Sequence, residues 1–138
     1  MKKYELLEHT ADAKVRAFGS TLEEAFENTA LGTFSIIVNP KTVKPKIKKE
    51  FTIKAKRMLS LLYDFLEELL IYLDTDGWLL AKIETLEIDE KNFKLHCVAY
   101  GDYFKGYDVG GEIKSVTYSD MEIKKTPKGY EITVVHDL

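Results

Sequence analysis

The residues of this chain that could bind a metal ion lie near its two ends. Asp12 stands in the stretch HTAD, and Asp137 is followed by Leu138 with its free carboxylate. These groups offer only oxygen ligands, which suit a hard cation such as Ca²⁺, Mg²⁺ or Mn²⁺ and do not suit Zn²⁺. A plainer interpretation makes Asp12 a turn residue and Asp137 a solvated chain end. The residues alone favour that plainer interpretation, because nothing local in the sequence shows that the two ends meet.

Two histidines accompany these acids. His9 precedes Asp12 and His136 precedes Asp137, so either histidine could be paired with an acid as a base or could bind a metal. A buried, hydrogen-bonded structural role is commoner for such residues, and we expect it for His136. The sequence contains no nucleophile elbow, no phosphate-binding glycine motif and no HExxH pair. A self-sufficient active site is therefore not predicted.

Three further features could contact a partner. The stretch 41–57 carries eight Lys or Arg and one acid, which could meet RNA phosphates or an acidic surface. A solvated strand face explains that stretch more simply, since it lacks the interleaved aromatic residues of a base-stacking platform. The loop 101–111, with four Gly and three aromatic residues, could dock a partner or cover the core. Lys114 falls on the opposite strand face to Ile113, where it is either a solvated side chain or a contact for phosphate.

The elements that must position these residues are short strands and amphipathic helices. We expect strands at 4–8, 14–18, 47–54, 78–88, 93–100, 112–124 and 130–138, and helices at 20–37 and 57–75. Ser20 or Thr21 is the expected cap of the first helix, because an acid follows three residues later. The order indicates an α+β fold, with two helices packed on one face of a mixed, mostly antiparallel sheet. We expect one domain spanning 1–138.

Composition narrows the class of protein. The net charge of −3 gives no global basic field that would draw the chain to nucleic acid or membrane. The single Cys97 excludes an internal disulfide, and there is no apolar run long enough for a membrane span. These features predict a cytoplasmic protein. Abundant Lys and Glu, with no Gln and three Asn, favour a thermophilic source.

Five motifs together resemble the archease family over nearly the whole chain. They are EHTAD near the start, STLEEAFENTALG over the first helix, LLYDFLEELL over the second, GGEIKSVTYSDMEI, and the terminal VVHDL. The resemblance implies a protein cofactor, not an enzyme. Such a cofactor activates an RtcB-type RNA ligase in tRNA splicing and RNA repair by promoting guanylylation of the ligase and repeated turnover.

The resemblance also implies a site. Asp12, Asp137 and the Leu138 carboxylate would bind a divalent cation, with Ca²⁺ preferred over Mg²⁺ or Mn²⁺, and Lys114 would contact the partner or a phosphate. RNA would be met only through the ligase, and no membrane is implied. Ser119 departs from the family pattern, in which many members have His. Two other functions stay open: a small metal-dependent phosphoesterase, and an RNA-binding or chaperone module for tRNA-processing enzymes.

Overall fold

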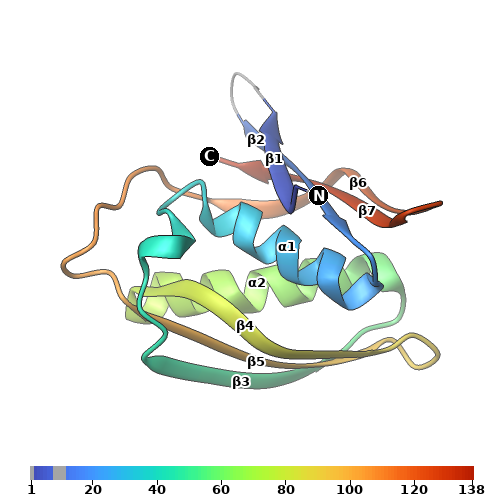
Figure 1. Cartoon of the computed structure of the whole chain (residues 1–138), viewed down its shortest axis with the longest axis horizontal. Helices are drawn as coiled ribbons and strands as arrows, with labels where there is room; N and C mark the ends of the chain where they lie inside the picture. Colours follow the sequence, from blue (N-terminus) through green and yellow to red (C-terminus); the bar gives the residue numbers. More distant parts are fainter. Residues whose placement is uncertain (1, 8–11) are drawn as a thin grey trace.

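Helices α1 (Leu22–Phe34) and α2 (Met58–Asp76) lie between two antiparallel sheets (Figure 1). This architecture is that of a computed structural model, which describes residues 2–7 and 12–138. Sheet A contains, in spatial order, β1 (Tyr4–Leu7), β2 (Asp12–Gly19), β7 (Gly129–Asp137) and β6 (Ser115–Thr126). Sheet B contains β3 (Ile47–Lys54), β5 (Lys94–Tyr103) and β4 (Trp78–Asp89). A short 3₁₀ helix, η1 (Pro40–Thr42), connects α1 to β3.

The predicted α+β class, with helices packed on antiparallel strands, is confirmed, and the arrangement differs in one respect. The strands form two antiparallel sheets with the helices between them, where one mixed sheet was expected. Helix α1 shows the reason, because both of its sides are buried. A Cβ at Gly32 would contact the Val15 side chain of sheet A, while Phe34 packs edge-on against Trp78 of sheet B with ring centroids 6.2 Å apart. A helix buried on two sides needs a layer of structure on each side.

The start of α1 follows the predicted capping pattern. Thr21 is the N-cap, and its hydroxyl accepts a hydrogen bond from the Glu24 main-chain N–H at 3.1 Å. The Glu24 carboxylate in turn accepts from the Ser20 main-chain N–H at 2.9 Å. The end of the helix was predicted three residues too late, since α1 stops at Phe34. Ile37 is buried in the turn that follows, so it extends the apolar pattern without being helical.

Aromatic side chains fill the space between the helices and sheet B. Successive ring contacts, with centroids 5.7 to 6.3 Å apart, link Phe26, Phe65, Phe51, Tyr72, Trp78 and Phe34. The Trp78 indole N–H donates to the main-chain carbonyl of Ile47 at 3.1 Å, which satisfies the polar atom of a fully buried ring. No helix in the described part of the chain combines the length and apolar character needed to cross a membrane.

The outer strand β6 of sheet A contains a break in its pairing. β6 pairs regularly with β7 up to Thr117 and resumes at Glu122, so the intervening residues bulge out of register. Within that bulge Asp120 adopts a left-handed conformation with φ 54°. The predicted strand at 112–124 begins later, at Ser115, and continues to Thr126.

Candidate metal and partner site

The two predicted acid ligands meet across neighbouring strands of sheet A. β2 and β7 pair antiparallel, and their register sets Asp12 directly opposite Asp137. The next pair along, Ala13 and His136, has its histidine side chain in the core. Because successive side chains of a strand alternate in direction, Asp12 and Asp137 point to the outer face of the sheet. Asp12 therefore lies in a strand, not in the turn that the plainer interpretation gave it.

Strand β6 completes the surroundings of Asp137. Ser115 lies opposite Asp137 on the other side, and its hydroxyl donates to the Asp137 carboxylate at 3.3 Å. The Lys114 main-chain N–H donates to the Asp137 main-chain carbonyl at 2.8 Å. Leu138 follows as an exposed residue just beyond the strand. Asp137 is therefore paired with a neighbouring strand on each side.

Lys114 lies beside this end of sheet A, just before β6. Its side chain is exposed, whereas Ile113 is 7% exposed and belongs to the core. The predicted difference in burial is confirmed, although both residues lie before β6 and not within the strand as expected. Lys114 is thus joined to Asp137 through its main chain, while its ammonium group faces solvent.

His136 is buried, as expected. Its Nε2 lies 2.8 Å from the hydroxyl of Thr33 on α1, and burial lowers the pKa of His136 to about 4. The imidazole is therefore neutral at physiological pH. His9 lies outside the described residues.

The donor set fits a hard cation and does not fit a soft one. Asp12, Asp137 and the Leu138 carboxylate supply only oxygen atoms, the ligands that Ca²⁺ and Mg²⁺ prefer. Within residues 2–7 and 12–138, no group of three or more His, Cys, Asp or Glu side chains is arranged to hold a metal. The predicted site takes its third ligand from the main chain, so it depends on the position of Leu138. Cys97 takes no part, because burial raises the pKa of its thiol to about 12.

Two residues near the acids, Ser115 and Lys14, were not predicted from the sequence. Ser115 could not be found, since its place beside Asp137 depends on the pairing of β6 with β7. Lys14 could have been found, because it follows Asp12 by two residues on the same strand face. The Lys14 ammonium group lies 3.6 Å from the Asp120 carboxylate in the β6 bulge. Lys14 and Asp120 both line a polar groove on the outer face of sheet A.

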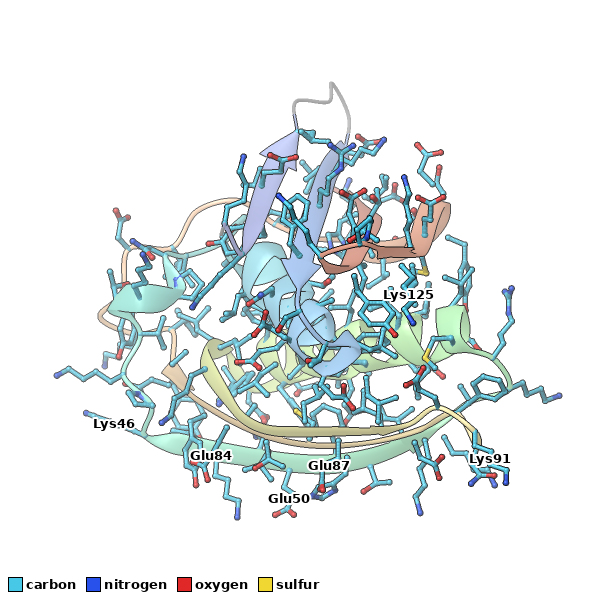
Figure 2. The ribbon with its side chains drawn as sticks, turned by 45° about the vertical axis from the view of Figure 1, so that its right-hand side comes forward. Lys46, Glu50, Glu84, Glu87, Lys91 and Lys125 are labelled. Carbon is cyan, nitrogen blue, oxygen red and sulfur yellow. The ribbon has the colours of Figure 1, made fainter. Side chains whose placement is uncertain are left out.

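The basic stretch 41–57 forms part of the edge of sheet B and the approach to it. Its charges are partly matched by acids: Lys48 lies 3.3 Å from Glu50, and Lys49 lies 2.8 Å from Asp76. The acidic side chains labelled on the outer side of sheet B in Figure 2 are Glu50, Glu84 and Glu87. The outer face of β3 is thus a mixed, solvated strand face, the simpler of the two predicted interpretations, whereas Lys49 points to the inner side and contacts α2.

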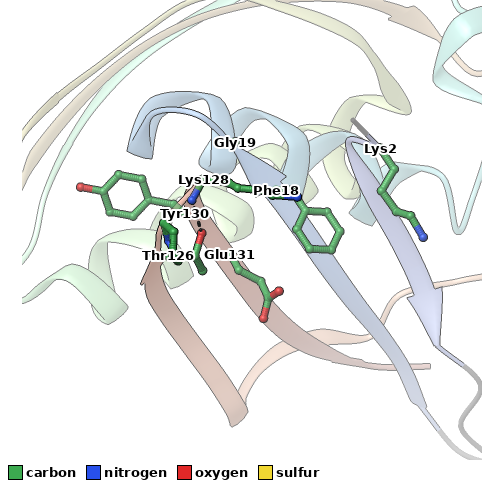
Figure 3. Close-up of a pocket in the computed structure, with 8 residues that line it drawn as sticks. Lys2, Phe18, Gly19, Thr126, Lys128, Tyr130 and Glu131 are labelled. Carbon is green, nitrogen blue, oxygen red and sulfur yellow. Dashed lines mark hydrogen bonds between the residues drawn. The ribbon is translucent and has the colours of Figure 1, made fainter.

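A second hollow lies at the other end of sheet A. It has a volume of about 430 Å³ and lies between Phe18 and the turn that joins β6 to β7 (Figure 3). Phe18 pairs with Glu131, six positions along the ladder from the Asp12–Asp137 pair. The hollow is therefore separate from the predicted metal ligands.

Comparison with known proteins agrees with the fold and the motifs. Residues 4–138 match the model of the Archease protein family (MTH1598/TM1083). The chain is 43% identical over 132 residues to protein archease of Thermococcus kodakarensis, covering 94% of this chain and 93% of that protein. It is 38% identical over 141 residues to protein archease of Methanosarcina mazei, covering 99% of this chain and 97% of that protein.

Solved structures show the same fold. The solution structure of Methanobacterium thermoautotrophicum protein 1598 superposes with a TM-score of 0.83 at 35% identity, with both chains covered completely. The crystal structure of a Thermotoga maritima protein, described as an archease and possible chaperone, superposes with a TM-score of 0.62 at 19% identity, covering 100% of this chain and 99% of that one. The second likeness concerns the fold alone. With a family match over nearly the whole chain and relatives near 40% identity, this protein belongs to the archease family.

Proposed function

We propose that this protein is a non-catalytic activator of an RtcB-type RNA ligase, and that it promotes guanylylation of the ligase. The observation that carries the proposal is the register that sets Asp12 opposite Asp137, on the outer face of sheet A. Family membership supports it, since the range that matches the family model, 4–138, includes both acids. A divalent cation held by Asp12, Asp137 and the Leu138 carboxylate would bring positive charge to that face.

The chemistry of guanylylation fits such a surface. A histidine nitrogen of the ligase bonds to the α-phosphorus of GTP, and the bond to the leaving pyrophosphate breaks. Negative charge therefore grows on the leaving phosphates, where a nearby positive group lowers the barrier. Lys114 is exposed beside Asp137 and would provide one such group. A protein that enters a partner's active site to supply charge acts in the manner of an arginine finger.

The test is an adduct assay with an RtcB-type ligase, GTP and Ca²⁺, Mg²⁺ or Mn²⁺. The wild-type protein should raise the yield of ligase–GMP adduct and the number of turnovers. Asp137→Asn, Asp12→Asn or a few residues added after Leu138 should remove that gain, and Lys114→Met should reduce it. Glu131→Gln is the matched control, because it makes the same charge change on the same strand face away from the site. Full activation by both Asp137→Asn and the extended chain would overturn the proposed cation site.

An RNA-binding or chaperone role is the second candidate. It is motivated by the basic stretch 41–57, and a Thermotoga maritima protein of the same fold is described as a possible chaperone. A gel shift with tRNA across a salt series separates the two functions. Binding that falls steeply with salt and ignores sequence would reflect only phosphate contacts.

A small metal-dependent phosphoesterase remains the enzymatic alternative. Such an enzyme would need its cation beside a bound phosphate ester, without help from a ligase. Phosphomonoesters and cyclic nucleotides incubated with the protein alone should stay intact if it is an activator. Turnover that depends on Asp12 and Asp137 would favour the enzyme.

A further inference from the structure

A groove runs between the C-terminal half of α2 and the segment 104–116, and we call it the α2 groove. It consists of two hollows of about 320 and 260 Å³ that share Asp74 and Ile113 as lining residues. The second hollow also includes Lys114 and Ser115, so one end of the groove lies beside Asp137. The segment crosses from sheet B to sheet A at the end of the molecule where α2 stops (left in Figure 1).

The α2 groove contains exposed apolar side chains that do not belong to the hydrophobic core. Ile71 of α2 is 43% exposed, and Phe104 and Val109 of the facing segment are 54% and 40% exposed. Scattered exposed apolar residues are normal on a protein surface, but these three line adjoining hollows. An apolar groove rimmed by polar groups is the usual form of a peptide-binding surface.

The segment that forms one wall of the groove is held in place. The Phe104 main-chain N–H donates to the Gly77 carbonyl at 2.7 Å, and the Gly110 N–H donates to the Ile37 carbonyl at 2.9 Å. Between these points the Tyr107 hydroxyl donates to the Asp102 carboxylate at 2.7 Å. A groove whose wall is already ordered loses little conformational entropy on binding.

The charges of the groove indicate which kind of partner would bind there. Among the described residues, three carboxylates line it, those of Glu67, Asp74 and Glu112, against one ammonium group, that of Lys114. This excess of negative charge repels RNA phosphates and attracts Lys or Arg. The chemistry fits a protein segment with bulky apolar side chains next to a basic residue.

We propose that the α2 groove docks a basic, apolar segment of the ligase and thereby orients the Asp12–Asp137 face toward the ligase's nucleotide. This inference rests on the proposed function, and it assigns binding and activation to different surfaces. Residues of the α2 groove determine the affinity for the ligase. Asp12 and Asp137 determine whether the bound ligase is activated.

The experiment uses charge reversal in the groove. Asp74→Lys is the main variant, because a cation in the last turn of α2 also suits the helix dipole and should not lower stability. Glu67→Lys on the same helix is the second. Glu84→Lys, on the outer side of sheet B (Figure 2), makes the same charge change far from the groove and is the control. Circular dichroism and thermal melting confirm folding of each variant.

Each variant is titrated against the ligase in the adduct assay and, separately, in a direct binding measurement. Asp74→Lys and Glu67→Lys should each raise the concentration for half-maximal activation and the Kd by about tenfold or more, since like charges meet in the complex. The maximal extent of activation should be unchanged, and the control should match the wild type. Asp137→Asn should show the reverse pattern, with unchanged binding and lost activation.

The outcomes separate the two proposals. If the wild type activates the ligase and both groove variants have unchanged midpoints, the docking inference is overturned and the proposed function stands. If the wild type binds without activating, and Asp74→Lys weakens binding, the docking inference is supported and the proposed function is overturned. If single-stranded RNA occupies the groove, shown by RNA binding that Asp74→Lys strengthens while ligase affinity is unchanged, docking of a protein segment is overturned.

Discussion

The charged residues on the outer faces of the two sheets are arranged differently. On sheet B, His96 of β5 lies opposite Thr52 of β3 and Glu87 of β4, and its Nε2 is 3.1 Å from the Glu50 carboxylate. On sheet A, the Asp12–Asp137 pair sets two acids opposite each other. Like charges directly opposite on neighbouring strands destabilise a sheet. On sheet B an acid therefore lies beside His96, whereas on sheet A two acids lie opposite each other.

Sheet B also contains two like charges that lie opposite each other on neighbouring strands. Lys54 lies opposite Lys94, but the third strand supplies Asp89 opposite Lys94 on its other side. On sheet A the third strand supplies the neutral Ser115 opposite Asp137. In the proposed function, a cation bound by the two acids would reduce their mutual repulsion, as Asp89 does for the two lysines. The two faces therefore differ in the residue that the third strand sets beside each like-charged pair, an acid on sheet B and a neutral serine on sheet A.

The largest effect should come from the packing of sheet B. A Cβ at Gly101 would overlap the Leu79 main-chain oxygen and come within 2.7 Å of the Trp78 indole. Because the obstacle includes main chain, Gly101→Ala should lower the free energy of unfolding by about 3 kcal/mol. Urea denaturation measures the change. Gly110→Ala is the control, since a Cβ there meets nothing within 4 Å, and its effect should be small. An equal loss in both variants would contradict the packing argument.

The next effect belongs to the acids of sheet A and depends on the cation. In chelator, Asp137→Asn should change the free energy of unfolding by no more than about 0.5 kcal/mol, because it removes one of two opposed charges but also weakens the hydrogen bond from Ser115. With Ca²⁺ at a hundred times its Kd, the wild type should gain about 2.7 kcal/mol and the variant should gain nothing.

Thermal melts with and without Ca²⁺ measure both parts of this prediction. Glu131→Gln, on the same face of β7 but opposite Phe18 and Lys124, should keep the full response to Ca²⁺. If Asp137→Asn responds to Ca²⁺ as the wild type does, Asp137 is not a ligand.

The contrast between the sheets also marks what the sequence could reveal. The alternation of Ile47, Phe51 and Ile53 predicted the inner face of β3 correctly, because a strand with one buried face shows period two wherever it lies in the fold. The turn at DEKN was also predicted, since a tight turn between adjacent strands depends on local residues: Asp89 accepts hydrogen bonds from the Lys91 and Asn92 main-chain N–H groups.

What could not be predicted depends on pairing between distant segments. Asp12 and Asp137 meet through the register of β2 and β7, strands from opposite ends of the chain, and neither strand encodes its partner. The division into two sheets could not be predicted from the sequence for a similar reason. The apolar stripe of α1 shows that one side is buried, whereas burial of the other side rests on small residues such as Gly32 and Thr33. The resemblance to a family, and not the pattern of residues, joined the two acids into one site.

A smaller effect should come from the contact that fixes the end of β7 to α1. Thr33→Val keeps the shape of the side chain and removes the hydroxyl that lies 2.8 Å from Nε2 of His136. A buried ring nitrogen left without its partner should cost about 1 to 2 kcal/mol of unfolding free energy, measured by urea denaturation in chelator.

The control for this variant lies one turn earlier on the same helix. Thr29 is also fully buried, but its hydroxyl donates to the Ala25 carbonyl, which is a helix-internal acceptor. Thr29→Val should therefore cost less than Thr33→Val. The reverse order would show that the Thr33–His136 contact contributes little to anchoring the strand that carries Asp137.

The smallest effect should come from the charged face of sheet B. Glu50→Gln weakens contacts to Lys48 and His96 whose side chains are about a third to a half exposed, so solvent screens them. The free energy of unfolding should fall by no more than about 0.5 kcal/mol, and the response to Ca²⁺ should be that of the wild type. The variant makes the same change of charge as Asp137→Asn, on the same kind of surface, in the other sheet. If Glu50→Gln also removed the response to Ca²⁺, the cation would be recognising general negative charge, and the distinction between the two faces would be lost.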